Sequence, residues 1–150
     1  MTDLFYENPY VQISKVYPDC YLASWSAAEY WNIIDELPRD IILFSSKIEE
    51  TKKINSLTVQ VKKVPENFFF DIQQEETADG LFNISSATKT IIDCFAFPNW
   101  AGGKRQVDYI FSLYAESDLY NPSLLLKQAK QILKPEQISH IFKLIQETAK

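Results

Sequence analysis

Residues Tyr21 to Asp40 read YLASWSAAEYWNIIDELPRD and combine a helix start, an aromatic helix and the return of the chain toward a strand. Ser26 precedes Glu29 by three positions, the spacing of a capping box, in which the hydroxyl and the carboxylate each bond a backbone amide at a helix N-terminus. We therefore predict that a helix begins at Ser26. Tyr30 and Trp31 occupy adjacent positions of this helix and so point to different sides. We expect Trp31 to anchor the helix and Tyr30 to stay at the surface as a candidate partner contact.

The following segments predict the strands of a small sheet. Residues 40–45 (DIILFS) are almost continuously apolar, as expected of a central strand covered on both faces. Residues 57–62 (LTVQVK) alternate apolar and polar side chains, the period of a half-buried strand. We also expect a strand at 67–72 and a short one at 81–84, with polar loops at 47–56 and 73–80.

Helix signals flank this sheet and fill the end of the chain. Asn8-Pro9 is an N-cap with proline at the first helical position, and it predicts a short helix that ends near Val16. Four further starts precede apolar residues at helical spacing: Ser85-Ser86, Gly102-Gly103, Asn121-Pro122 and Lys134-Pro135. The last helix has the predicted apolar stripe Ile138, Ile141, Phe142 and Ile145. The order predicts an α+β fold: a small mixed sheet of three to four short strands covered by about six helices, with an all-helical C-terminal third.

Composition limits the class of protein. The chain has 150 residues, of which 46% are hydrophobic, and this suits one folded domain. We place that domain at residues 8–150 and treat residues 1–7 as a tail. The formal net charge of −5 is unlike the basic surface of nucleic-acid-binding domains. No apolar run is long enough to span a bilayer and the first residues do not resemble a signal peptide, so we expect a cytoplasmic protein without a membrane partner.

Residues that could carry catalysis form no complete set. The chain has only three glycines, too few for a P-loop or a dinucleotide-binding fingerprint. Asp40, Glu50 and Lys52 superficially resemble the acid, then acid-x-lysine, pattern of metal-dependent nucleases. Glu50 and Lys52, however, fall in a predicted polar connection rather than on a strand beside Asp40. We expect no catalytic, metal or cofactor site and retain a nuclease as an alternative.

The cysteines and the histidine offer little more. Cys20 and Cys94 lie far apart and belong to no paired motif, so we expect small buried hydrophobic residues rather than a disulfide or metal ligands. His140 is the single histidine, which leaves Cys94 with His140 as the one conceivable cysteine–histidine dyad. We expect His140 at the surface or at the edge of the core.

Four cations join Tyr30 as candidate contacts with a partner or with nucleic acid. Lys104 and Arg105 follow the double glycine at a helix start, where the helix dipole slightly opposes positive charge. Such cations are solvated or meet an acidic partner. Arg39 precedes the predicted central strand, and Lys89 lies near another helix start.

Several segments occur in an order that resembles a known family. They are residues 24–31 (SWSAAEYW), 39–44 (RDIILF), the turn at Pro65-Glu66, residues 84–93 (ISSATKTIID) and 102–107 (GGKRQV). This pattern resembles the C-terminal domain of the AbiEi antitoxins, the antitoxin half of type IV toxin–antitoxin systems, first known from abortive infection of phage-attacked bacteria. The resemblance covers about residue 8 to the end, and its motifs are structural rather than catalytic.

The resemblance implies a non-enzymatic protein that counteracts a nucleotidyltransferase toxin without requiring a tight complex. Many family members also repress their own operon through an N-terminal winged helix-turn-helix, of which residues 1–6 resemble only the tail. The resemblance thus implies a toxin as functional partner, and DNA only where such a module is present elsewhere. A DNA-binding accessory regulator, in which Lys89, Lys104 and Arg105 face phosphate, is the alternative.

Overall fold

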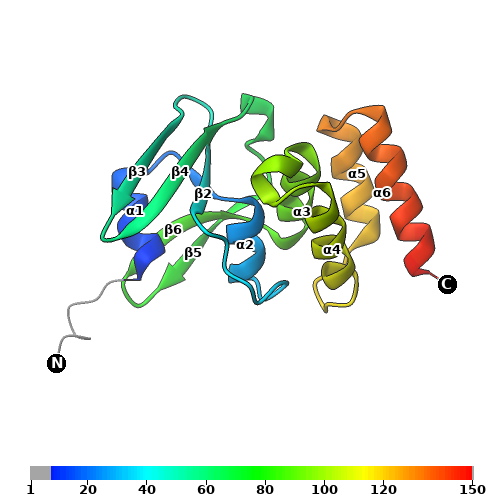
Figure 1. The fold of residues 1–150 in the computed structure, drawn as a ribbon, viewed down its shortest axis with the longest axis horizontal. Coiled ribbons are helices and arrows are strands. Elements are labelled where there is room, and N and C mark those ends of the chain that lie inside the picture. Colours follow the sequence, from blue (N-terminus) through cyan, green and yellow to red (C-terminus); the bar gives the residue numbers. More distant parts are fainter. Residues whose placement is uncertain (1–7, 150) are drawn as a thin grey trace.

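The computed structural model describes residues 8–149, and the segment 1–7, expected to be a tail, lies outside them. A β-sheet formed by the N-terminal half and a group of helices formed by the C-terminal half lie next to each other along the long axis (Figure 1). The α+β class and the helical C-terminal third are confirmed. Within residues 8–149 the sheet has six strands rather than three to four.

The sheet consists of two hairpins on either side of a central pair. Its strands are β1 (Tyr21–Leu22), β2 (Ile41–Ser45), β3 (Glu50–Ile54), β4 (Leu57–Lys63), β5 (Ile72–Thr77) and β6 (Gly80–Ser85). Their spatial order is β3-β4-β2-β1-β6-β5. β2 pairs antiparallel with β1 and parallel with β4, and β1 pairs parallel with β6, so the sheet is mixed. β2 is a central strand, as its apolar run predicts.

The edge strands β3 and β5 lie where we expected polar loops. β3 pairs antiparallel with β4, and β5 pairs antiparallel with β6. The side chains of β3 are exposed apart from Ile54, which is half-buried. An edge strand is held by backbone pairing on one side and is commonly polar, so its composition resembles that of a loop.

The strand expected at 67–72 is also wrong, because this segment turns instead of extending. It contains the short 3₁₀ helix η2 (Glu66–Phe68), and Asp71 has a left-handed φ of 53°. Phe68 is buried against the sheet, while β5 begins only at Ile72. The apolar run therefore fills the core from a connection rather than from a strand.

The helix starts predicted from caps agree closely with the structure. The helices are α1 (Pro9–Val16), α2 (Ser24–Tyr30), α3 (Ala87–Ala96), α4 (Lys104–Ala115), α5 (Pro122–Ile132) and α6 (Pro135–Thr148). The side chains of Asn8, Ser86 and Asn121 each accept a hydrogen bond from a backbone amide in the first turn of α1, α3 and α5, respectively. These three caps confirm the local reading of the sequence.

The capping box at Ser26 is wrong. α2 begins at Ser24, and Ser26 lies buried inside the helix, where its Oγ accepts a hydrogen bond from the Ile42 amide at 2.9 Å. The amide of Ala23 donates to the carbonyl of Ile42, so pairing with β2 holds the chain up to the first turn of α2. The start of this helix is therefore set by the sheet and not by a side-chain cap.

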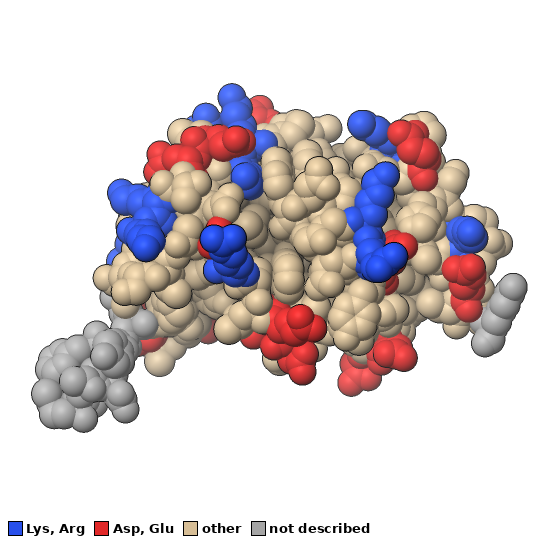
Figure 2. Space-filling model, viewed as in Figure 1, with Lys and Arg blue, Asp and Glu red and all other residues tan. Residues whose placement is uncertain are grey.

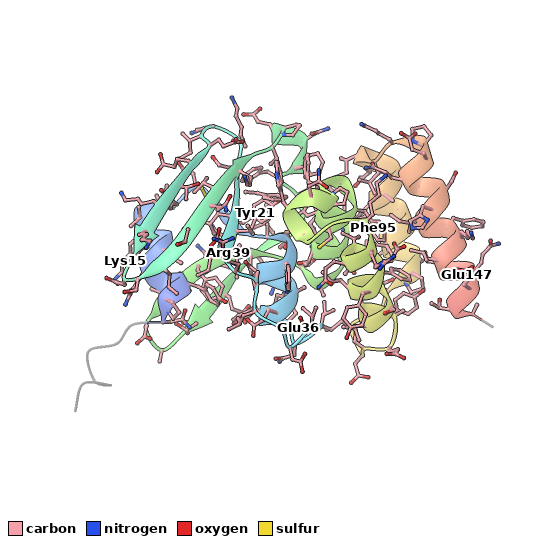
Figure 3. All side chains as sticks on the ribbon, in the orientation of Figure 1. Lys15, Tyr21, Glu36, Arg39, Phe95 and Glu147 are labelled. Atoms are coloured by element: carbon pink, nitrogen blue, oxygen red, sulfur yellow. The ribbon has the colours of Figure 1, made fainter. Side chains whose placement is uncertain are left out.

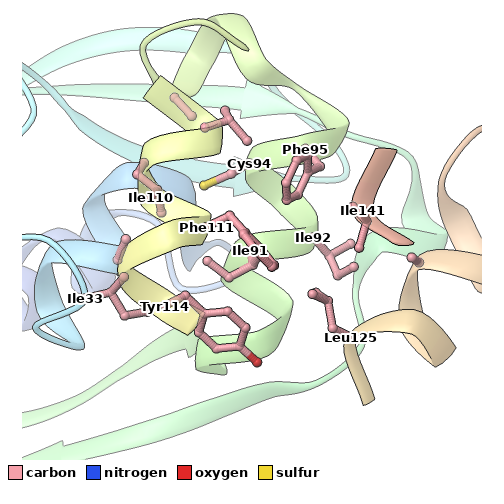
Figure 4. Packing of buried hydrophobic residues seen from close by; sticks show 14 of the residues in the cluster. Ile33, Ile91, Ile92, Cys94, Phe95, Ile110, Phe111, Tyr114, Leu125 and Ile141 are labelled. Carbon is pink, nitrogen blue, oxygen red and sulfur yellow. The ribbon is translucent and has the colours of Figure 1, made fainter. Parts of the chain in front are cut away.

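α3 lies at the centre of the molecule, and all its residues from Thr88 to Phe95 are buried. One side of α3 packs with α4, α5 and α6 (Figure 4). Another side meets the face of the sheet that carries Tyr21 and Phe44. The opposite face of the sheet, with Leu43 and Val61, is covered by α1. α3 thus joins the sheet to the helices.

α6 is the last and outermost helix (Figure 1). Ile141 is fully buried in its predicted stripe, whereas Phe142 is largely exposed, so the stripe is only partly correct. Within residues 8–149, no helix is both long and apolar enough to cross a membrane.

Candidate functional site

A groove opens where the first turns of α4 and α6 meet the end of α3, and its volume is about 510 Å³. Its lining comprises Phe95 of α3, Pro98 of the short helix η3 (Pro98–Ala101), Lys104, Val107 and Asp108 of α4, and Lys134, Glu136, Gln137 and His140 from the start of α6. This volume lies in the range of pockets that bind small molecules or side chains. The groove is therefore the candidate functional site.

The double glycine shapes one wall of the groove. Gly102 and Gly103 have φ angles of 93° and 100°, in the left-handed region that favours glycine. A Cβ atom at Gly102 would lie 2.8 Å from Cγ of Gln106 and 3.2 Å from Cζ3 of Trp25. Glycine at these two positions allows α4 to begin directly after η3, which places Lys104 at the groove.

Gln137 fixes the opposite wall. Its Oε1 accepts a hydrogen bond from the Lys134 amide at 2.9 Å, and its Nε2 donates to the Phe95 carbonyl at 3.1 Å. One side chain thus caps the first turn of α6 and ties it to the end of α3. These two hydrogen bonds fix the position of the start of α6 relative to the end of α3, on the two sides of the groove.

The groove combines an apolar floor with charged walls. Phe95 and Val107 are buried and form its floor. His140 Nε2 lies 2.9 Å from Oδ1 of Asp108, and both side chains are 44% exposed. Among residues 8–149, Lys104 and Lys134 have no ion-pair partner. The arrangement suits binding of a group that is partly apolar and partly anionic.

Only part of the predicted contact set lies here. Lys104 lines the groove, and Arg105 is the next residue of α4; both are exposed. Arg39 is also exposed, but Figure 3 shows it over the sheet half, away from Phe95 of the groove. Lys104 and Arg105 therefore lie together at the groove, whereas Arg39 lies away from them.

Tyr30 is less available than expected. It is half-buried, and its ring makes edge contacts with Tyr10, Trp31 and Phe82. Trp31 is also half-buried, and its Nε1 donates to the Ser85 carbonyl at 2.9 Å. Both rings therefore have partners within the domain, and Tyr30 lies outside the groove.

Lys89 is the clearest correction among the predicted site residues. Its side chain is fully buried, and Nζ lies 2.6 Å from Oδ1 of Asp93 and donates to the Tyr21 hydroxyl at 3.0 Å. Nζ also lies 4.9 Å from the ring centroid of Phe70 and 5.4 Å from that of Phe68. Lys89 cannot contact phosphate or a partner in this structure. We misjudged it because the rings that cover it come from a distant segment.

Burial dominates the electrostatics of this cluster. It lowers the pKa of Lys89, although Asp93 opposes this shift. Burial raises the pKa of Asp93 to about 6, opposed by Lys89 and by the Tyr21 hydroxyl. The two charges are therefore held by each other and by the hydroxyl in a site without solvent.

The structure separates the residues of the nuclease alternative. Gln60 donates to Asp40, whereas Glu50 accepts a hydrogen bond from the Tyr17 hydroxyl on the α1 side of the sheet. Gln60 alternates along β4 with the α1-facing Val59 and Val61, so Asp40 lies toward the other face. Asp40 and Glu50 cannot bind one metal ion in this arrangement. No cluster suited to a metal occurs among residues 8–149.

Cys94 and His140 have different partners and do not form a dyad. The Cys94 thiol is buried 3.8 Å from the Ser24 hydroxyl, and burial raises its pKa to about 12. A thiol with such a pKa is protonated at neutral pH and is a poor nucleophile. His140 instead pairs with Asp108 in the groove. Cys20 and Cys94 are both free and buried, as we predicted.

Charge is mixed on the face drawn in Figure 2. Lysine, arginine and acidic side chains form small separate groups there, without a continuous basic stripe. Electrostatic binding of nucleic acid normally requires such a stripe. This face is better matched to a partner with small charged groups.

Sequence reasoning missed four polar residues of the groove: Asp108, Lys134, Glu136 and Gln137. Gln137 lies three residues after Lys134, the spacing at which a glutamine side chain accepts from the N-cap amide, and this spacing was an available signal. Nothing in the local sequence indicated that α4 and α6 would come together at Asp108 and His140.

No protein-family model matches the chain, and a comparison with curated proteins gives no significant match. The similarity to AbiEi antitoxins therefore remains a resemblance carried by the ordered motifs.

Proposed function

We propose that this chain is an antitoxin-type domain that counteracts a nucleotidyltransferase toxin by a non-enzymatic route. One observation carries the proposal: the segments that resemble AbiEi antitoxins pack on one another. Trp31 of the segment 24–31 donates to the Ser85 carbonyl of the segment 84–93. Trp25 of the segment 24–31 lies where a Cβ of Gly102, in the segment 102–107, would touch it. Packing of these segments on one another is consistent with motifs that belong to a shared fold.

The polar groups of the core support a structural use of these motifs. Lys89 and Asp93 of the segment 84–93 form a buried pair completed by Tyr21. Ser85 and Thr90 of the same segment share a hydrogen bond of 2.6 Å. These side chains hold α3 against the sheet, so binding at the surface is the activity that we propose.

Co-expression tests the proposal. A nucleotidyltransferase encoded beside this chain is expressed from an inducible promoter, with or without the chain, and colony formation is counted. We expect the chain to restore growth, and a toxin with an inactivated nucleotidyltransferase site to leave growth unaffected in both cases. Continued growth arrest, with the chain soluble and folded in the same cells, would exclude an antitoxin function.

A further inference from the structure

We propose that the groove between α4 and α6 docks a short acidic and apolar segment of a partner protein. A carboxylate of that segment interacts with Lys104 and Lys134, and a neighbouring apolar side chain packs on Phe95 and Val107. The proposal concerns the groove alone. It does not depend on the antitoxin function, because the partner need not be a toxin.

The two lysines define the charge of the bound group. Lys104 and Lys134 line the same groove from different helices, both are exposed, and neither has an ion-pair partner among residues 8–149. Each lies at the start of a helix, where the backbone amides add positive potential rather than compensating it. The bound group is therefore expected to be anionic, because the two lysines have no counter-charge of their own within the described part of the chain.

The floor defines the rest of the ligand. Phe95, Pro98 and Val107 present apolar atoms to the groove, and burying such atoms against a partner is favourable. An apolar centre with a polar rim is the usual anatomy of a protein interface.

The acidic residues of the groove argue against nucleic acid. Asp108 is hydrogen-bonded to His140 from the facing helix and forms no ion pair with either lysine. Glu136 lies in the first turn of α6, where the helix N-terminus favours a negative charge. Both carboxylates repel a phosphate backbone, which carries charge along its whole length. A peptide with one or two carboxylates meets less of this repulsion than a phosphate backbone does.

Binding can be measured on the isolated chain with two capped tetrapeptides, Glu-Leu-Glu-Phe and Gln-Leu-Gln-Phe. Backbone amide resonances are followed by NMR during titration. We expect the acidic peptide to shift the resonances of Val107, Asp108, Gln137 and His140, with a millimolar dissociation constant. The amide peptide lacks the charge-assisted contacts, so we expect it to bind about tenfold more weakly.

Two double variants distinguish the effect of the groove lysines from the effect of the net charge of the protein. K104Q/K134Q should weaken binding of the acidic peptide about tenfold. K127Q/K143Q removes the same charge from exposed positions on α5 and α6 outside the groove lining and should leave binding unchanged. The dispersion of the amide spectrum shows whether each variant is folded.

Three results would overturn the proposal: equal affinity for the two peptides, shifts located outside the groove, or no shift at millimolar peptide. Groove shifts produced by a short duplex DNA but not by the acidic peptide would also overturn it, in favour of nucleic acid. The co-expression assay does not enter this test, so the groove proposal and the antitoxin proposal can fail separately.

Discussion

At the scale of single residues, the Lys89–Asp93 pair is a buried ion pair of the core. Both side chains are fully buried, and the Tyr21 hydroxyl bonds to both. Removing one partner of such a pair leaves a buried charge without compensation, whereas replacing both with apolar groups often restores stability. The pair is thus a sensitive probe of whether α3 is packed as described.

We predict that Lys89→Met lowers the free energy of unfolding by about 3–5 kcal/mol, because Asp93 loses its counter-charge. The double variant K89M/D93L should recover much of this loss. Urea unfolding measures both values, and Lys127→Met, at an exposed position of α5, is the matched control with little expected change. A loss at Lys89 no larger than at Lys127 would contradict the burial of this pair.

The pH dependence of stability should carry the signature of Asp93. Its pKa is raised to about 6 in the folded protein, against 3.8 for an unperturbed carboxyl. Between pH 4 and 6 the folded state thus binds more protons than the unfolded state, so the contribution of Asp93 to stability falls as pH rises through this window. The difference corresponds to about 3 kcal/mol.

This prediction is tested by the difference in unfolding free energy between the wild type and Asp93→Asn, measured by urea at intervals from pH 4 to 7. Subtraction removes the contributions of the titrating groups that do not interact with Asp93. We expect the stability of the wild type relative to Asp93→Asn to decrease up to about pH 6 and then level off. An increase over the same window would show that the pKa is depressed instead.

Lys89 also shows why part of the site could not be read from the sequence. Its spacing of four residues from Asp93 permits a helical ion pair, whether exposed or buried. What decides burial is the cover supplied by Phe68 and Phe70, which belong to a connection about twenty positions upstream. Local pattern contains no information on that contact.

At the scale of elements, the β3–β4 hairpin carries a strained turn. Asn55 and Ser56 connect Ile54 to Leu57 and have φ angles of 50° and 73°. Two central residues with positive φ are typical of a type I′ turn, whose favoured sequence is Asn-Gly. Serine at the second position therefore costs stability that glycine would not.

We predict that Ser56→Gly raises the free energy of unfolding by about 1 kcal/mol. Thermal or urea unfolding measures the change. The same substitution at Ser139, inside α6, should instead be destabilising by about 0.5 kcal/mol because glycine is less favourable than serine in a helix. Destabilisation by both substitutions would argue against a left-handed conformation at Ser56.

The elements also show how far sequence patterns extend. Caps at Asn8, Ser86 and Asn121 give correct helix starts because capping is local chemistry. The apolar run of β2 gives a correct central strand. The edge strands β3 and β5 escape detection because only their pairing with β4 and β6 distinguishes them from loops.

At the scale of the whole molecule, α3 couples a sheet to a helical group, and the groove lies at the end of this coupling helix. The groove could not be predicted because Phe95, Lys104 and His140 come from three helices whose packing is set by the core. Lys104 was found as a candidate only because the double glycine marks a helix start.

The lysines of the groove should contribute little to the stability of the fold. Lys104 and Lys134 are exposed, so we predict that K104E/K134E changes the free energy of unfolding by no more than about 0.5 kcal/mol. Urea unfolding beside K127E/K143E measures this. A loss of several kcal/mol in the groove variant alone would mean that the lysines stabilise the helical group, and its binding phenotype would then reflect unfolding.

Growth rescue tests the central claim most directly. Cells that express a nucleotidyltransferase proposed as the toxin, at a fixed level, are plated with and without this chain, and plating efficiency is compared at equal abundance of the nucleotidyltransferase. The antitoxin proposal predicts that the chain restores colony formation to the level seen with an inactivated toxin. Unchanged growth arrest in cells that contain the folded, soluble chain would contradict it.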